Sequence, residues 1–301
     1  QAHLGLNRGW FDQRKIAIPT TGYSDGFGHV LLFEDTTNTL LGTLQEELDE
    51  LESSGTEHAI LSWEGLNMYD QVKINNLYEY LKGHDVTVLA YLREQAEVIQ
   101  SGYLQAVKQR RQRRNLEDYQ TSNILLKPMH INYENLLDRY ANAFGRENIE
   151  ARVYERSRLK EGNIVLDFLD ALGLELSEDF ILASSEQNIS LDVGSARLLN
   201  IMDSIYSDPE DRAALIDLLL ANIAANGHDK KYFLPQVKID FIRDHYYASN
   251  QAVAEKYMAT NLDDGGIFSS KNTGDIKLNL HALAAEKLEF LNSMKDYHYW
   301  R

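Results

Sequence analysis

Short apolar segments alternate with longer amphipathic segments through roughly the first 190 residues of this 301-residue chain. The apolar segments, which we predict to be strands, are residues 16–18, 58–63, 86–92 and 149–154. The segments with apolar side chains at helical spacing, which we predict to be helices, are residues 38–51, 69–81, 94–111, 133–144 and 164–172. Strands that alternate with helices of this length indicate βαβ units, and therefore a mainly parallel sheet covered by helices.

From about residue 191 the strand signals stop and only helical periodicity continues. The helices predicted there are residues 195–206, 210–226, 237–260 and 280–294. We therefore predict an α/β fold with two regions. Residues 1–190 form the α/β core, and residues 191–301 form a helical C-terminal region that packs on the core.

The composition is that of a globular protein with a sizeable core, because 44% of the residues are apolar. No apolar stretch approaches the ~20 residues that a membrane-spanning helix needs, so we expect no transmembrane segment. The absence of cysteine excludes disulfides, thiolate metal ligands and cysteine nucleophiles, and fits a cytoplasmic location. We find no other pattern of metal ligands and expect no metal cofactor.

The net charge of −16 argues against nucleic acid as a partner, since nucleic-acid binders gain affinity chiefly by neutralising phosphates. One basic cluster stands out against this background, formed by Lys108, Arg110, Arg111, Arg113 and Arg114. It could be a solvated helix end whose cations complement the helix dipole. Because five positive charges in seven residues repel one another, we favour contact with an anion, either a saccharide or the nucleotide at its entrance.

The apolar segment at residues 86–92 ends in Arg93, and a helical pattern follows at once. Ser101 lies eight residues after this arginine, about two helical turns along. The carboxyl end of a parallel strand opens into the ligand crevice, where the amides and dipole of the next helix favour an anion. The spacing alone also fits an arginine paired with a carboxylate at the sheet edge and a serine on the helix surface.

The order of a strand, Tyr91-Leu92-Arg93 and then Ser101 resembles the 3′-phosphate-binding segment of sulfotransferases that use 3′-phosphoadenylyl sulfate (PAPS). Further stretches are similar to the bacterial sulfotransferase-like branch: ILSWE (60–64), AFGRENIEARVYE (143–155), LKEGNIVLDFLDALGL (159–174), NISL (188–191) and YYASNQAVAEKY (246–257). The resemblance implies a P-loop NTPase-like three-layer fold with a central, mainly parallel sheet. It also implies that Arg93 and Ser101 hold the 3′-phosphate of the donor.

One part of the family pattern is not found in the sequence. These sulfotransferases begin with a strand and a loop like K-T-G-T-[TS]-S, whose lysine and amides hold the 5′-phosphosulfate of PAPS. The first residues here, QAHLGLNR, resemble the family segment that comes directly after that loop. The loop either lies upstream or has been lost, and we favour the first because Gln1 falls in mid-helix by pattern. Without the loop, the leaving phosphate lacks its main stabiliser.

Glu64 follows the predicted strand at residues 58–63, so it belongs at the crevice side of the sheet. By resemblance to carbohydrate sulfotransferases, Glu64 takes the proton from the acceptor; otherwise it is a helix cap or an ion-pair partner. His29 is the alternative base, since some members of the family use histidine. A lone histidine in the glycine-rich loop at residues 20–29 is more often simply exposed.

The sequence thus predicts a sulfotransferase that transfers a sulfuryl group from PAPS to a hydroxyl or amine and releases adenosine 3′,5′-bisphosphate (PAP). A saccharide is the favoured acceptor, with substrate contacts from Lys108, Arg110, Arg111 and Arg114. Two alternatives share the same pattern. One is a kinase-like P-loop enzyme, which needs magnesium. The other is a non-catalytic descendant that binds only nucleotide or glycan.

Overall fold

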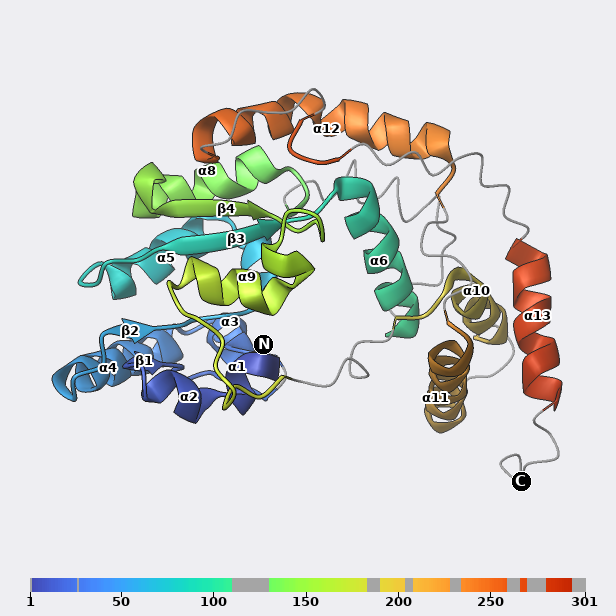
Figure 1. The fold of residues 1–301 in the computed structure, drawn as a ribbon, viewed down its shortest axis with the longest axis horizontal. Coiled ribbons are helices and arrows are strands. Elements are labelled where there is room, and N and C mark those ends of the chain that lie inside the picture. Colours follow the sequence, from blue (N-terminus) through green and yellow to red (C-terminus); the bar gives the residue numbers. More distant parts are fainter. Residues whose placement is uncertain are drawn as a thin grey trace. The chain divides into compact units, whose positions relative to one another are not determined.

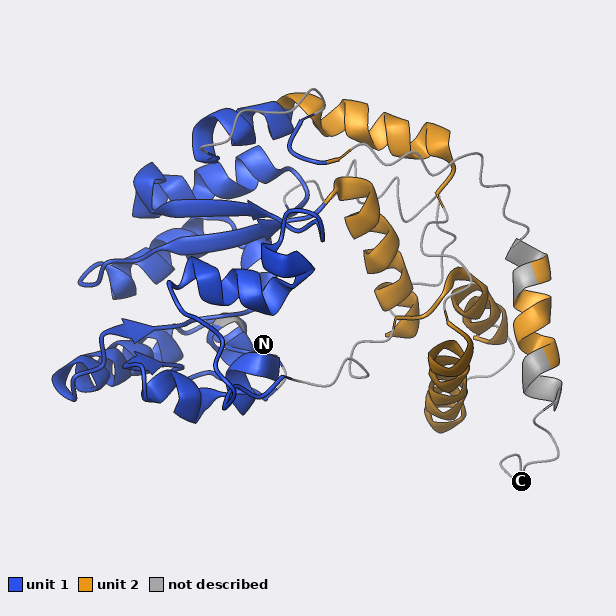
Figure 2. Ribbon diagram, in the orientation of Figure 1, with its two compact units in different colours: residues 1–93, 129–184, 249–268 blue, residues 94–128, 185–248, 269–301 orange. Residues whose placement is uncertain are grey.

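The computed structural model describes residues 2–25, 27–109, 130–182, 190–203, 208–227, 234–258, 266–269 and 280–293. The chain divides into two compact units (Figure 2). Unit 1 comprises residues 1–93, 129–184 and 249–268, and unit 2 comprises residues 94–128, 185–248 and 269–301. This division differs from a core of residues 1–190 followed by a helical region, because 94–128 group with the helical unit and 249–268 with the α/β unit.

The described strands all belong to unit 1 and form two parallel pairs (Figure 1). β1 (Ile16–Ala17) pairs with β2 (His58–Ala59), and β3 (Val88–Leu92) pairs with β4 (Ile149–Val153). The order of the predicted strands and their parallel direction are confirmed, but β2 covers only the first two residues of the strand predicted at 58–63. The central sheet of the predicted P-loop NTPase-like three-layer fold is not seen, because the described strands form two separate sheets. β1 is short and ends ahead of Pro19, which has no backbone N–H to donate to a neighbouring strand.

The helices of unit 1 largely follow the predicted periodicity. They are α1 (Ala2–Leu6), α2 (Arg8–Asp12), α3 (Val30–Glu34), α4 (Thr39–Ser53), α5 (Gln71–Leu81), α8 (Tyr133–Phe144) and α9 (Ile164–Ala171), with the 3₁₀ helices η1 (Glu64–Met68), η3 (Arg146–Asn148) and η4 (Lys160–Gly162). α4, α5, α8 and α9 confirm predicted helices, whereas five residues give α3 too little periodicity to be predicted. Side chains cap three of them: Asp70 accepts from the Lys73 N–H in α5, Asn132 from the Asn135 N–H in α8, and Asn163 from the Val165 N–H in α9.

Two clusters of buried apolar side chains stabilise unit 1. The larger cluster combines α4, α5, β3, α8, β4 and the end of α12 (Gln236–Tyr257). Its residues exposed by 1% or less include Leu44, Ile74, Leu92, Leu137 and Val253. The smaller cluster packs α1, α2 and β1 against α9 and Phe180. Burial of these side chains holds the two strand pairs to their covering helices.

Unit 2 is helical in its described residues. Its helices are α6 (Gln95–Lys108), α10 (Val193–Met202), α11 (Pro209–Asn226), α13 (Leu280–Ser293) and the first part of α12. Val107, Leu199 and Leu219 belong to the apolar cluster that joins α6, α10, α11 and α13. A buried ion pair adds to it, with Lys287 Nζ 2.9 Å from Asp192 Oδ2 at the start of α10. The helices predicted after residue 191 are thus confirmed.

A buried carboxylate ties α9 to the β3–β4 pair in unit 1. Asp167 Oδ1 accepts hydrogen bonds from the Tyr91 hydroxyl (2.8 Å) and from Arg152 Nη1 (3.1 Å). Its Oδ2 accepts one from the backbone N–H of Lys160 (2.8 Å). Burial raises the pKa of Asp167, but these hydrogen bonds outweigh the effect and hold the pKa below its ordinary value. The ionised carboxylate is therefore the form that joins the helix to both strands.

Asp167→Asn is expected to lower the free energy of unfolding by about 2–4 kcal/mol. The substitution deprives Arg152 of its most buried partner and removes the charge that accepts from Tyr91. Urea unfolding followed by tryptophan fluorescence measures the change, because Trp10 and Trp63 both lie in unit 1.

Asp170→Asn is the matched control on the same helix. The Asp170 side chain is 44% exposed and pairs with Lys160, so its loss is expected to change the free energy of unfolding much less than the loss of Asp167 does. Equal losses for Asp167→Asn and Asp170→Asn would contradict the role assigned to the buried carboxylate.

Candidate functional site

The junction between β3 and α6 is the first part of the candidate site. Arg93 directly follows β3 and is half-buried. Its guanidinium lies over the ring of Tyr154, with 5.9 Å between Cζ and the ring centroid. The hydroxyl of Tyr133 donates a hydrogen bond to the Arg93 carbonyl (2.5 Å). Leu92 is only 1% exposed, so the core fixes the end of the strand from which Arg93 emerges.

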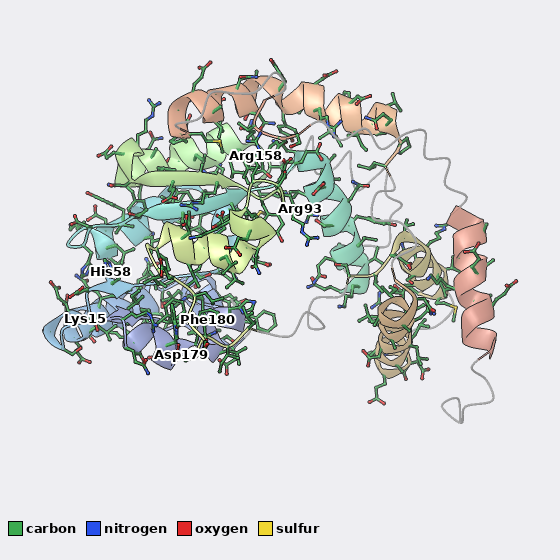
Figure 3. All side chains as sticks on the ribbon, viewed as in Figure 1. Lys15, His58, Arg93, Arg158, Asp179 and Phe180 are labelled. Carbon is green, nitrogen blue, oxygen red and sulfur yellow. The ribbon has the colours of Figure 1, made fainter. Side chains whose placement is uncertain are left out.

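The residues that follow β4 lie at the same end of this strand pair, because β3 and β4 are parallel. The backbone N–H of Tyr154 donates to the Leu92 carbonyl (2.7 Å), which extends the pairing by one residue. A turn follows, in which the backbone N–H of Arg158 donates to the Glu155 carbonyl (2.8 Å). Figure 3 shows Arg93 and Arg158 at this shared end. Basic side chains from two neighbouring strands are thus collected at one edge.

α6 begins two residues after Arg93, close to the predicted position, but a carboxylate engages its first turn. The Glu94 side chain accepts a hydrogen bond from the Glu97 backbone N–H (3.3 Å) and lies 3.1 Å from Arg243 Nε. Burial raises the pKa of Glu94, against the opposing effect of Arg243. Glu94 thus already bonds one of the first amides of α6, which leaves fewer of these amides for an anion.

Ser101 lies in the second turn of α6 and is half-buried. Its hydroxyl donates a hydrogen bond to the Val98 carbonyl of the same helix (3.1 Å). Arg93 is the last residue of unit 1, whereas Ser101 belongs to unit 2. A serine hydroxyl has one donor and two acceptor positions and rotates readily, so the bond to Val98 is one that a ligand can replace.

Lys108 is the described member of the basic cluster. It is the last residue of α6 and is half-buried, and its carbonyl accepts a hydrogen bond from Arg212 Nη1 (2.8 Å). A cation from α11 thus already complements the end of this helix. The other members lie outside the described residues: Arg110, Arg111, Arg113 and Arg114. The interpretation of the cluster as a substrate contact stays a prediction.

Glu64 is the first residue of η1, and its side chain is exposed. The Tyr140 hydroxyl of α8 donates a hydrogen bond to the Leu66 carbonyl (2.8 Å), which fixes η1 from one side. The Trp63 ring also covers Gly65, where an added Cβ would lie 2.1 Å from the ring. Glu64 is therefore an exposed carboxylate on a backbone with little freedom, as a proton acceptor requires.

His29 is fully buried, which contradicts its interpretation as an exposed loop residue. Its Nε2 lies 3.0 Å from the Pro19 carbonyl oxygen, and its Nδ1 accepts a hydrogen bond from the Ser62 backbone N–H (3.1 Å). Its own backbone N–H donates to the Ser62 carbonyl (2.8 Å). Burial lowers the pKa of His29, outweighing the hydrogen bonds that raise it. The neutral ring, with its proton on Nε2, links the end of β1 to the segment before Glu64.

Sequence reasoning did not single out the polar residues around β4. Glu155 and Arg158 follow β4 as Arg93 follows β3, so the rule that parallel strand ends share an edge could have found them. No sequence pattern predicted the burial of Asp167, because a carboxylate on an amphipathic helix is ordinarily exposed.

The described part of the chain contains neither a cluster of metal ligands nor a membrane-spanning helix. It holds no group of three or more histidine, aspartate or glutamate side chains that could bind a metal ion. None of its helices is long and apolar enough to cross a membrane. The candidate residues described in unit 1 are Glu64 and Arg93, and Ser101 is the candidate residue described in unit 2.

Comparisons with known proteins give few relatives. No protein-family model matches the chain. A protein of Archaeoglobus fulgidus, described as uncharacterized, is 27% identical over 195 residues, which cover 63% of this chain and 51% of that protein. The chain thus spans about half the length of this curated relative. The crystal structure of a sulfotransferase from Alicyclobacillus acidocaldarius matches 73% of this chain and 87% of its own, with 15% identity and a TM-score of 0.38.

The free energy of unfolding is expected to fall as the pH drops from about 7.5 to 5.5, in part because of His29. A histidine whose pKa is lowered in the folded state stabilises the protein above its ordinary pKa of about 6.5. This stability is lost as the pH falls below that value, by at most about 1.4 kcal/mol per pH unit. His29→Gln is expected to show a shallower pH dependence in urea unfolding at several pH values.

His58→Gln is the matched control, because His58 is an exposed histidine on β2 (Figure 3). It is expected to keep the pH dependence of the wild-type protein. The same slope in His29→Gln and wild type would show that the His29 ring is not the neutral link between Pro19 and Ser62.

Proposed function

We propose that this protein is a PAPS-dependent sulfotransferase that acts on a hydroxyl or amine of a saccharide. The observation that carries the proposal is the junction at Arg93. A parallel strand ends in an arginine, and a helix with Ser101 about two turns along follows at once. Ligands of α/β proteins bind at the carboxyl ends of parallel strands, and the planar guanidinium matches a phosphate.

In this proposal Arg93 and Ser101 bind the 3′-phosphate of PAPS and keep the same contacts with the product, PAP. Arginine supplies two parallel N–H donors to the phosphate oxygens, and serine supplies a hydroxyl. The saccharide contacts are assigned to Lys108, Arg110, Arg111 and Arg114. The nucleotide is thereby anchored by a group that takes no part in the bond changes, so its binding energy serves to position the sulfuryl group.

Glu64 is proposed as the general base. The acceptor oxygen or nitrogen attacks sulfur in line with the bond from sulfur to the bridging oxygen of the 5′-phosphate. The acceptor proton passes to the Glu64 carboxylate, and the electrons of the breaking bond stay on the phosphate oxygen. His29 is the less suitable base, because both of its ring nitrogens contact backbone groups. The charge on the leaving phosphate needs donors such as the K-T-G-T-[TS]-S loop of the enzymes that this chain resembles.

Arg93→Ala is expected to weaken the binding of adenosine 3′,5′-bisphosphate about 10- to 100-fold, because it removes a charge-assisted contact to phosphate. Titration calorimetry measures the affinity. Arg146→Ala is the matched control, since its guanidinium also lies over a tyrosine ring (Tyr257, 5.8 Å) but the residue precedes β4. Wild-type affinity in Arg93→Ala would contradict the assignment.

Glu64→Gln is expected to lower the rate of sulfuryl transfer about 10²- to 10⁴-fold, because the amide cannot accept the proton. The affinity for PAP should be unchanged. The rate is measured as transfer of labelled sulfate from PAPS to a panel of saccharides, and the affinity by calorimetry.

Glu147→Gln is the control for this substitution, since Glu147 is an exposed glutamate in the first turn of another 3₁₀ helix, η3. It is expected to keep full activity. An active Glu64→Gln variant beside an inactive, folded His29→Gln variant would move the role of base to His29.

A further inference from the structure

The carboxyl end of the β3–β4 pair gathers three arginines. Arg93 follows β3, whereas Arg156 and Arg158 belong to the turn after β4. Figure 3 shows Arg93 and Arg158 at this end of the strands. Within residues 154–158 a single carboxylate, Glu155, stands beside the two arginines. Such a concentration of positive charge is notable in a chain whose net charge is −16.

The acidic side chains of β4 and α9 are engaged with other cations. Arg152 Nε lies 2.6 Å from Glu150 Oε1, and its Nη1 lies 3.1 Å from Asp167 Oδ1. Asp170 pairs with Lys160, with 2.7 Å between Oδ1 and Nζ. The three carboxylates exceed the two cations of this cluster, Arg152 and Lys160, by one charge, which is less than the charge of the three arginines at the strand ends. The edge keeps an excess of positive charge with which to attract an anion.

Arg158 is held in place by the turn to which it belongs. Its backbone N–H bonds the Glu155 carbonyl, and its Nε lies 3.8 Å from Glu155 Oε2. The Glu155 side chain is 5% exposed and that of Arg158 is 35% exposed. A buried carboxylate thus orients an arginine that still reaches solvent. Since this contact is made through Nε, the two terminal nitrogens of the guanidinium can donate to a ligand.

We propose that Arg158 joins Arg93 in binding the phosphate group, so that arginines from two neighbouring strands hold one anion. This inference rests on the proposed function and deepens it. A phosphate monoester carries −1.5 to −2 charges near neutral pH, about as many as two guanidinium groups balance. The ligand class is a nucleotide with a monoester phosphate on its 3′-oxygen. Arg158 is a binding residue in this account and takes no part in proton transfer.

The test uses two nucleotides that differ only in this phosphate, adenosine 3′,5′-bisphosphate and adenosine 5′-monophosphate. Calorimetry on the 301-residue protein should show that Arg158→Ala lowers the affinity for the bisphosphate about 10- to 100-fold. The affinity for the monophosphate should change less than about twofold. Arg158→Lys keeps the charge next to Glu155 but loses the planar fork, so it should lose an intermediate amount, and it replaces the alanine variant if that fails to fold.

Arg156→Ala is the matched control, because it removes the same charge from the same turn. If Arg156→Ala and Arg158→Ala lose the same affinity for both nucleotides, Arg158 acts only through the long-range attraction of its charge. That result would overturn the inference. Wild-type bisphosphate affinity in Arg158→Ala, beside a loss in Arg93→Ala, would overturn it and leave the proposed function standing. A wild-type protein that binds both nucleotides equally would instead overturn the 3′-phosphate site itself.

Discussion

The parallel pairing of β3 with β4 is the interaction on which the proposed site depends. Because the two strands run in the same direction, the residues that follow them, Arg93 and Arg158, come to one edge. The pairing is secured on both sides: Leu92 lies in the apolar core, and the Asp167 carboxylate fastens α9 to both strands. The backbone that carries each arginine side chain is held in one position in this way. Less entropy is then lost when the arginine binds a ligand.

A second fixed point lies beyond β2, where the buried His29 ring holds the backbone of Ser62. His29 therefore links the segments that follow β1 and β2. The exposed carboxylate of Glu64 lies two residues after Ser62. The proposed chemistry thus divides between an element that anchors the phosphate and an element that accepts a proton. Arg93 and Glu64 both belong to unit 1, whereas Ser101, the other proposed phosphate contact, belongs to unit 2.

Local sequence patterns predicted the positions of the helices and strands better than they predicted how the strands pair. The apolar segments at residues 86–92 and 149–154 predicted β3 and β4, because a buried strand needs a run of apolar side chains. The single central sheet was not predictable in the same way, since strand pairing is set by contacts distant in sequence. The burial of His29 was missed for a related reason: a glycine-rich loop has no periodicity, and its packing between strand ends depends on Pro19 and Ser62.

The comparison of adenosine 3′,5′-bisphosphate with adenosine 2′,5′-bisphosphate tests the central claim most directly. The two nucleotides carry the same charge and differ only in the ribose oxygen that bears the second phosphate, so attraction to a basic surface treats them alike. The site at Arg93 predicts clearly tighter binding of the 3′,5′-isomer by the wild-type protein, measured by calorimetry. Equal affinity for the two isomers would contradict the claim that this strand end recognises a 3′-phosphate.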